Sequence, residues 1–162
     1  MPVRHVRSFR RWVSLFASAL LPHIHPFVCL AAAGVEPRPT NSPIGPRGLQ
    51  CEFAPNPAGV DTLAPKLSWR LSAAPNSRGK RQTAYQVLVS RTSADLERET
   101  GDLWDTGRVE GEESLHIPYQ GWGLASGQQV FWRVRVWDEH DVASAWSATA
   151  SWTMGILTEA DW

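Results

Sequence analysis

The sequence predicts an all-β domain in which two sheets pack as a sandwich, and two observations support this. From Leu49 onward, short runs of alternating apolar and polar residues are separated by Gly, Pro, Asn or Asp clusters, as in strands joined by turns. Only one helical turn is expected, Ser93–Glu99, with Ser93 as its cap. An immunoglobulin-like sandwich uses seven short strands, and the same number is expected here: Leu49–Phe53, Lys66–Leu71, Ala84–Arg91, Leu103–Val109, Ser114–Tyr119, Gln129–Asp138 and Ser147–Met154.

The N-terminal segment predicts export. Residues 1–33 place four arginines before the apolar run 12–21 and end in three alanines, which is the order of a secretory signal peptide. The apolar run is shorter than the ~20 residues of a membrane span, so no span is expected. A lipoprotein anchor at Cys29 is disfavoured because the bulky Val28 precedes it. The protein is therefore expected to be secreted or periplasmic.

Three further segments follow the predicted signal peptide. Residues 34–47 are rich in proline and lack apolar periodicity, so they are expected to form an extended linker. The sandwich is assigned to residues 48–155, and residues 156–162 to the start of a connection toward a further domain. Cleavage after Ala33 would leave Cys51 as the one remaining cysteine, so no internal disulfide is expected.

Successive side chains of a strand point to opposite faces of its sheet, which predicts the core. One face carries Leu67, Trp69 and Leu71, and another carries Tyr85, Val87 and Val89. In the strand 129–138 the inward residues are Val130, Trp132, Val134 and Val136, and the outward row is Phe131, Arg133, Arg135 and Trp137. The outward arginines and Trp137 are expected to interleave as a structural ladder. In the last strand the inward residues are Trp146, Ala148, Ala150, Trp152 and Met154.

Charge and motifs exclude several function classes. Residues 51–162 carry ten Lys or Arg and fifteen Asp or Glu, a net charge of −5 with His neutral. Such a surface has no electrostatic attraction for nucleic acid. The sequence has no nucleophile-elbow, Walker or dinucleotide-binding motif, so no cofactor is expected.

No catalytic or metal site is predicted. A glycosidase needs two carboxylates held about 5–10 Å apart across a sugar cleft. Asp138, Glu139 and Asp141, and the group Glu110, Glu112 and Glu113, all fall in expected turns, so each is interpreted as a solvated loop. His116 and His140 are isolated and lack the spacing of a zinc site.

Four apolar residues are the candidates for contact with a partner or a sugar. Trp122 lies between glycines in a loop, where an exposed indole suits docking or sugar stacking. Docking or local packing is favoured, because one aromatic makes a poor sugar platform. Ile156, Leu157 and Trp162 follow the last strand with no further element to pack against, so a seam with a downstream domain is expected, with Trp122 beside it.

The motifs along the domain resemble a known set. In order, they are LQCEFAPNPAGVD, PKLSWRL, RQTAYQVLVS, GDLWDTGRV, YQGWGL, FWRVRVWDEHDVASAWS and WTMGILTEADW, and they cover residues 47–162. Together they are similar to the N-terminal domain of bacterial α-L-rhamnosidases. Two features differ from that pattern: the hairpin glycine is absent near Asp141, and the tyrosine of the penultimate strand is replaced by Val130 or Phe131.

The resemblance implies a fibronectin type III-like sandwich at the start of a longer secreted enzyme. Further β-domains and an (α/α)6 barrel normally follow it, and the barrel supplies the carboxylates that hydrolyse terminal α-L-rhamnosides. No residue of that barrel has a counterpart here, so no catalytic role is assigned and rhamnoside binding is expected only in the missing catalytic domain. The alternatives are a stand-alone secreted interaction module and a small carbohydrate-binding module.

Overall fold

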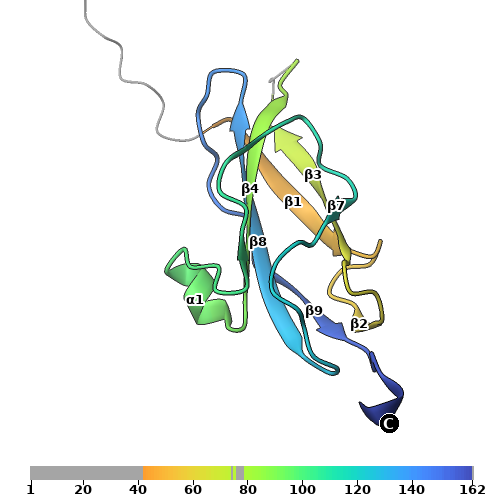
Figure 1. The fold of residues 1–162 in the computed structure, drawn as a ribbon. Helices are drawn as coiled ribbons and strands as arrows, with labels where there is room; N and C mark the ends of the chain where they lie inside the picture. Colours follow the sequence, from red (N-terminus) through yellow and green to blue (C-terminus); the bar gives the residue numbers. More distant parts are fainter. Residues whose placement is uncertain (1–41, 74, 76–78, 162) are drawn as a thin grey trace, which may run out of the picture. The chain divides into compact units, whose positions relative to one another are not determined.

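A computed structural model of the protein describes residues 42–73, 75 and 79–161. The described part contains two sheets, a short helix and a C-terminal 3-10 turn (Figure 1). The smaller sheet has the order β1-β3-β7 and the larger one the order β2-β9-β8-β4-β5, with β6 also paired to β4. The fold is thus the all-β immunoglobulin-like sandwich that the sequence predicts.

The bounds of the elements are as follows. The smaller sheet consists of β1 (Ile44–Cys51), β3 (Lys66–Ala73) and β7 (Ile117–Pro118). The larger sheet consists of β2 (Ala58–Val60), β4 (Gln82–Ser90), β5 (Trp104–Asp105), β6 (Val109–Glu110), β8 (Gln129–Asp138) and β9 (Ala150–Met154). Helix α1 spans Ser93–Glu97 and the 3-10 helix η1 spans Glu159–Asp161.

The centre of the larger sheet is the antiparallel pair β4 and β8, whose register runs from Gln82 opposite Asp138 to Ser90 opposite Phe131. On its other side β8 pairs antiparallel with β9, and β9 pairs in parallel with the short β2. The strand β9 therefore lies inside the sheet.

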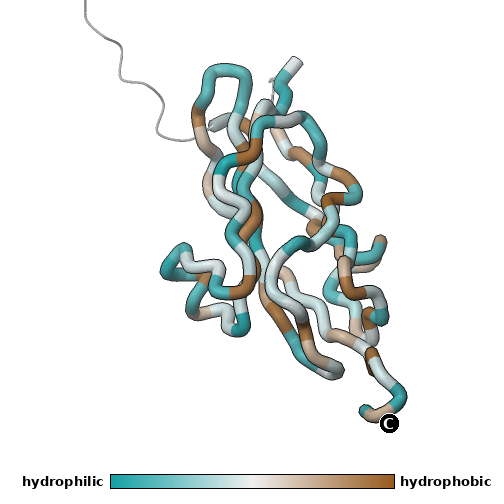
Figure 2. Tube along the Cα trace, viewed as in Figure 1, coloured by the Kyte–Doolittle hydropathy of each residue, from teal (hydrophilic) through white to brown (hydrophobic). Residues whose placement is uncertain are grey.

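The core lies between the two sheets and contains three fully buried tryptophans, Trp69, Trp132 and Trp152. The inward residues predicted for β4 and β8 are buried, and the outward residues of β8 are half-buried. Hydrophilic residues gather in α1 and in the loop after β8 (Figure 2). Burial alternates along β8 as predicted, whereas in β4 every residue from 84 to 90 is buried, so both faces of that strand are covered.

Several predicted bounds differ from the structure. Strand β1 begins at Ile44 rather than Leu49, so residues 44–47 of the expected linker are in a strand. Pro46 is compatible with this because β1 is the edge strand of its sheet, where a missing N–H is tolerated. The run 103–109 forms two short strands, β5 and β6, instead of one, and β2 was not expected.

The helix cap is Thr92 and not Ser93, because the Thr92 hydroxyl accepts a hydrogen bond from the Asp95 N–H at 3.2 Å.

The prediction for the last strand was wrong for the residues before Ala150. Strand β9 begins at Ala150, and Trp146 lies half-buried on the outer side while Ser147 is buried. The Ser147 hydroxyl accepts a hydrogen bond from the Val134 N–H at 3.1 Å, which accounts for its inward position.

The turn after β8 is organised by Asp138, whose side chain is 1% exposed. Its carboxylate accepts hydrogen bonds from the Ser42 hydroxyl at 2.7 Å, the His140 N–H at 2.9 Å and the Val142 N–H at 3.0 Å. Burial raises the pKa of this carboxyl, but the three hydrogen bonds outweigh it, and the pKa is lowered. Asp141 has a φ of 61°, so it occupies the left-handed position expected for a hairpin glycine. The expectation that Asp138 is solvated was wrong.

Candidate functional site

The other carboxylates first considered as acids or bases are mostly held in ion pairs. Glu112 pairs with Arg81 and Glu139 pairs with Lys80. Glu110 and Asp141 both pair with Arg108. Arg108 therefore links the two groups of carboxylates.

The two histidines do not form part of a metal cluster. In residues 42–73, 75 and 79–161, no group of three or more His, Cys, Asp or Glu is placed to hold an ion. The ring of His116 lies edge-on to Phe53 with centroids 5.2 Å apart. His140 Nε2 is 3.6 Å from the Glu139 carboxylate.

The outer face of the larger sheet carries a ladder of alternating arginine and tryptophan side chains. The Arg135 guanidinium lies 5.1 Å from the ring centroid of Trp137 and 4.6 Å from that of Trp146. Arg108 extends the ladder beyond Trp137 at 5.1 Å, and Arg133 lies 5.8 Å from Trp146. The sequence predicts the part on β8 but not Trp146, which joins from the segment before β9.

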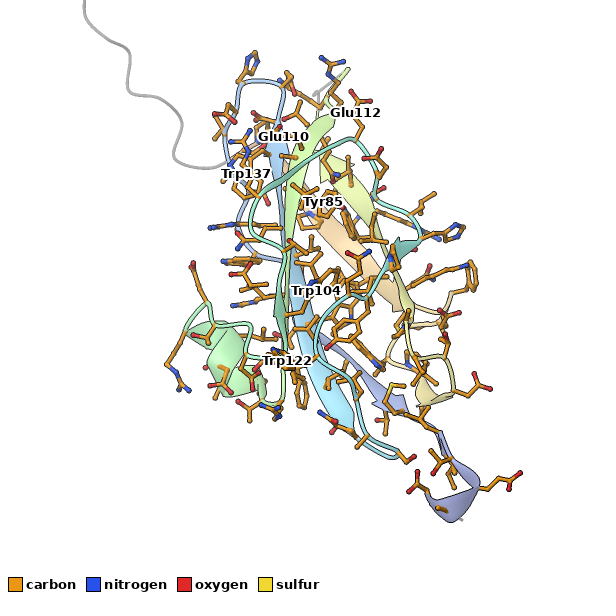
Figure 3. All side chains as sticks on the ribbon, viewed as in Figure 1. Tyr85, Trp104, Glu110, Glu112, Trp122 and Trp137 are labelled. Carbon is orange, nitrogen blue, oxygen red and sulfur yellow. The ribbon has the colours of Figure 1, made fainter. Side chains whose placement is uncertain are left out.

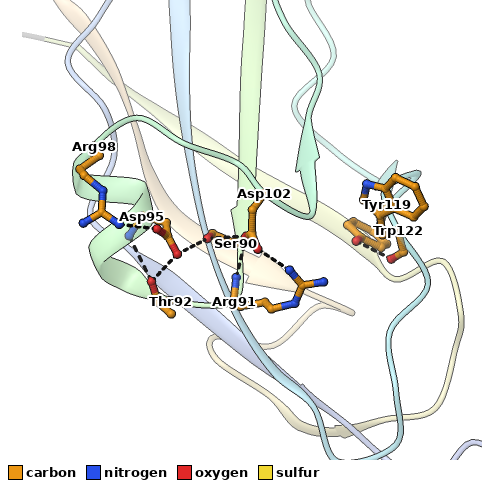
Figure 4. Close-up of polar contacts among 8 residues, drawn as sticks. All are labelled: Ser90, Arg91, Thr92, Asp95, Arg98, Asp102, Tyr119 and Trp122. Atoms are coloured by element: carbon orange, nitrogen blue, oxygen red, sulfur yellow. Dashed lines mark hydrogen bonds and ion pairs between the residues drawn. The ribbon is translucent and has the colours of Figure 1, made fainter.

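Trp122 is 73% exposed, as its place between two glycines predicts. It lies in the long connection between β7 and β8 (Figure 3). The Trp122 N–H donates to the Leu103 carbonyl at 3.0 Å. The Trp122 carbonyl accepts a hydrogen bond from the Tyr119 hydroxyl at 2.7 Å (Figure 4). The backbone of Trp122 is thus held at both polar groups while its indole remains in solvent.

The residues around Trp122 leave little space for its backbone to shift. A Cβ on Gly121 would lie 2.4 Å from the Leu103 carbonyl oxygen and 2.6 Å from the Trp104 Cβ, so a larger residue cannot fit without rearrangement. Tyr119 is buried, and burial raises the pKa of its phenol to about 12. The Tyr119 hydroxyl therefore keeps its proton, and with it the hydrogen bond to Trp122.

Beside Trp122 is an open groove whose remaining walls are mainly polar. Its lining is Gly101, Asp102, Leu103, Trp104, Asp105, Gln120, Gly121, Trp122 and Gly123. Trp104 is half-buried and meets Tyr119 edge-on at 5.3 Å, and Tyr119 in turn meets Trp152 at 5.7 Å. The wall of the groove is thus continuous with the core.

Asp102 and Asp105 are fixed by hydrogen bonds at one end of this groove. Asp102 accepts from the Ser90 hydroxyl at 2.6 Å and pairs with the Arg91 guanidinium at 2.6 Å (Figure 4). Burial raises the Asp102 pKa, but these partners outweigh it and the pKa is lowered. Asp105 Oδ1 accepts from Gln86 at 2.7 Å and from the Gly107 N–H at 2.8 Å.

The tail after β9 differs from its expected form. Ile156 is 43% exposed, but Leu157 is half-buried and packs against the core, and its N–H donates to the Ser126 hydroxyl at 2.9 Å. Trp162 lies outside the described residues. Figure 3 shows Trp122 apart from η1, but the loop after Trp122 contacts the start of the tail, where the Gly127 N–H donates to the Gly155 carbonyl at 3.2 Å.

Residues 46–158 match the family described as "Rha78A-like, N-terminal immunoglobulin domain". The chain belongs to this family. The match confirms the resemblance of the motifs to the N-terminal domain of α-L-rhamnosidases. The immunoglobulin domain named for the family agrees with the two sheets described above.

Relatives with curated names carry the name "Alpha-L-rhamnosidase". One from Streptomyces avermitilis is 42% identical over 112 residues, which is 68% of this chain and 10% of the relative. One from Alteromonas sp. is 35% identical over 151 residues, which is 93% of this chain and 16% of the relative. The chain thus spans less than a fifth of the length of these relatives.

Solved structures of α-L-rhamnosidases are similar in fold to this chain. An α-L-rhamnosidase from Dictyoglumus thermophilum has a TM-score of 0.69 and 39% identity, covering 73% of this chain and 13% of that one. The Streptomyces avermitilis α-L-rhamnosidase complexed with L-rhamnose also has a TM-score of 0.69, with 37% identity, covering 74% of this chain and 11% of that one.

No helix within the described residues has the length and apolarity needed to cross a membrane.

The groove beside Trp122 is the feature that sequence reasoning missed. Trp104 and Gln120 were not among the predicted site residues, although both line it. One indication of it was present in the sequence, because Gly121 and Gly123 directly flank Trp122. It could not reveal that Trp104, eighteen positions earlier in the chain, also lines the groove.

Proposed function

We propose that this chain is the non-catalytic N-terminal module of a secreted α-L-rhamnosidase, an enzyme that hydrolyses terminal α-L-rhamnosides. The observation that carries the proposal is the family match over residues 46–158, together with relatives of that name of which the chain covers only 10% to 16%. The rhamnoside would be bound and hydrolysed by another part of the longer polypeptide.

The role of the module in this proposal is to pack against downstream domains of the same polypeptide. Ile156 supports it, because a large apolar side chain at this exposure is stabilised by burial in an interface. Leu157 lies in the same connection and packs against the core of the sandwich, and Trp162, which lies outside the described residues, is proposed to join the same interface. The polypeptide would thus enter the next domain along a segment that is already fixed at one end.

Secretion or location in the periplasm is part of the proposal. It is supported by the arginines, apolar run and alanines of residues 1–33, which lie outside the described residues. Residues 34–41 of the proposed linker lie outside them as well.

Hydrolysis of an aryl α-L-rhamnoside tests the catalytic part of the proposal. The purified chain alone should give no turnover above a buffer blank, whereas the longer polypeptide that contains it should hydrolyse the substrate. Turnover by this chain that is lost on changing Asp138 or Glu139 to its amide would contradict the proposal.

Substitution in the tail tests the docking part. Ile156→Asp in the longer polypeptide should lower its thermal stability and increase hydrogen exchange in residues 155–161, because a charge would be buried in the interface. The matched control is Leu115→Asp, which changes another exposed apolar residue, 63% exposed, before β7. Equal effects of the two substitutions would count against a seam at the tail.

A further inference from the structure

The groove beside Trp122 extends along one side of the domain. Trp104, Asp105 and Gln120 line both this groove and an adjoining one, whose other residues include Tyr85, Thr106 and Ile117. Figure 3 shows Trp122, Trp104 and Tyr85 following one another along the molecule. The two grooves therefore form one continuous surface, which we call the Trp122–Tyr85 groove.

From this surface we infer a binding site for a neutral saccharide chain, with one pyranose ring stacked on the Trp122 indole and the next units lying past Trp104 toward Tyr85. A pyranose has an apolar C–H face and an edge of hydroxyls. An aromatic ring matches the face, and amide or carboxylate groups match the hydroxyls.

The backbone of Trp122 presents its indole to solvent from a fixed position. It is hydrogen-bonded at both polar groups and confined by Gly121, so the point from which the ring projects is set before any ligand arrives. A ligand then needs to order only the side chain and not the loop, which lowers the conformational entropy lost on binding.

The side chains around Trp122 offer hydrogen-bonding groups that a sugar can use. Among the described residues, the exposed Gln120 amide has no hydrogen-bond partner, so it offers donors and an acceptor to a ligand. Asp105 uses Oδ1 for its two internal hydrogen bonds and leaves Oδ2 available to accept from a hydroxyl. The structure thus provides polar groups in the same groove as the indole.

The residues around Trp122 distinguish a saccharide from an apolar protein surface. In the part of the groove beside Trp122 the exposed residues are Asp102, Asp105, Gln120 and Gly123, and apolar Val109, Ile117 and Pro118 occur only in the part toward Tyr85. A protein interface core is depleted of charged residues, whereas two indoles among polar groups, Trp122 and the half-buried Trp104, suit a sugar better than the single aromatic that the sequence indicates. The charge of Asp102 is balanced by Arg91, but the hydrogen-bond partners of Asp105 are neutral, so Asp105 repels uronate groups and favours a neutral saccharide.

Titration of the whole chain tests the site on its own, so its failure is distinguishable from failure of the proposed function. The probes are methyl α-L-rhamnopyranoside, cellotriose and tri-galacturonate, observed through the indole and amide N–H resonances. We expect saturable shifts of the Trp122 indole and Gln120 amide with at least one neutral probe. Tri-galacturonate should give none.

Variants localise the binding. Trp122→Ala should weaken the neutral saccharide at least tenfold, which corresponds to about 1.4 kcal/mol, and Trp122→Tyr should restore part of the affinity. Phe53→Ala is the matched control, since it removes an aromatic ring that is 65% exposed outside the groove, and it should leave affinity unchanged.

Two results would overturn the inference. One is the absence of shifts with both neutral probes up to their solubility limits, and the other is equal weakening by Trp122→Ala and Phe53→Ala. Protection of the Trp122 indole from a fluorescence quencher in the longer polypeptide would instead assign the groove to an interface between domains.

Discussion

The Arg–Trp ladder and the Trp122 loop show two ways in which this domain places an indole outside its core. In the ladder, Trp137 and Trp146 lie between arginine side chains at 4.6 to 5.8 Å. Trp122 is held through its backbone, and its ring lies in solvent. The ladder indoles thus contribute contacts to the fold, while the Trp122 indole is available to a ligand or partner.

Exposure alone therefore does not separate structural aromatic residues from those available for binding. What separates them is whether the ring itself or only its backbone is engaged. The tryptophans and one buried carboxylate are accordingly expected to contribute different amounts to the free energy of unfolding.

The largest loss is expected in the core. Trp132→Ala, and likewise Trp69→Ala, should lower the free energy of unfolding by about 3–5 kcal/mol, because each leaves a cavity between the sheets. Trp69 also loses the hydrogen bond from its Nε1 to the Gln82 side-chain oxygen at 3.0 Å. Chemical denaturation measures the effect, and a loss below about 1 kcal/mol would contradict the assigned burial.

A smaller loss is expected at the hairpin. Asp138→Ala leaves the His140 and Val142 N–H groups without their acceptor, at a cost of about 1–3 kcal/mol at neutral pH. The folded pKa of Asp138 is lowered from its ordinary 3.8, so its contribution is present above the unfolded pKa and is lost as pH falls through the folded value.

Denaturation as a function of pH checks the sign of this effect. The stability difference between the original protein and Asp138→Ala should shrink as the pH falls below about 4. Glu112→Ala, which removes an exposed carboxylate, is the control and should change stability by less than about 0.5 kcal/mol. A difference that grows in acid would refute the assigned hydrogen bonding.

The ladder should give a measurable coupling. A double-mutant cycle of Arg135→Ala and Trp146→Ala should report an interaction of about 0.5–1 kcal/mol between the guanidinium and the indole. The cycle removes the separate contribution of the Arg135 hydrogen bond to Gln86. Additive effects of the two changes would show that the stacked geometry does not stabilise the fold.

The smallest effect is expected at the site of the inferred groove. Trp122→Ala should change the free energy of unfolding by less than about 0.5 kcal/mol, because its ring is in solvent and its backbone hydrogen bonds remain. Thermal and chemical denaturation both measure this. A loss as large as that of Trp146→Ala would place the indole among the structural ones.

The sequence was most informative where one strand has two different faces. The alternation along residues 129–138 predicted both the bounds of β8 and its buried side. It failed at Trp146, because residues 145–149 are irregular and Ser147 turns inward to bond the backbone of β8. Alternation predicts faces only where the backbone is a regular strand.

The features that the sequence did not predict depend on contacts between segments that are far apart in the chain. Asp138 looked like a loop charge because its partner Ser42 lies 96 positions away, and the groove joins Trp104 to Trp122 through tertiary packing. The apolar Leu157 was expected to lack a partner, yet it contacts the core that earlier strands form. None of these relations has a local pattern in the sequence.

The place of β9 has a mechanical consequence. Because β9 is bonded to β8 on one side and to β2 on the other, a pull on the C-terminus along this strand loads the hydrogen bonds of both ladders together. Inter-strand bonds lie across the strand direction, so such a force shears them rather than opening them one at a time. Tension passed along the polypeptide would therefore meet its resistance at β9, the strand that also carries the core residue Trp152.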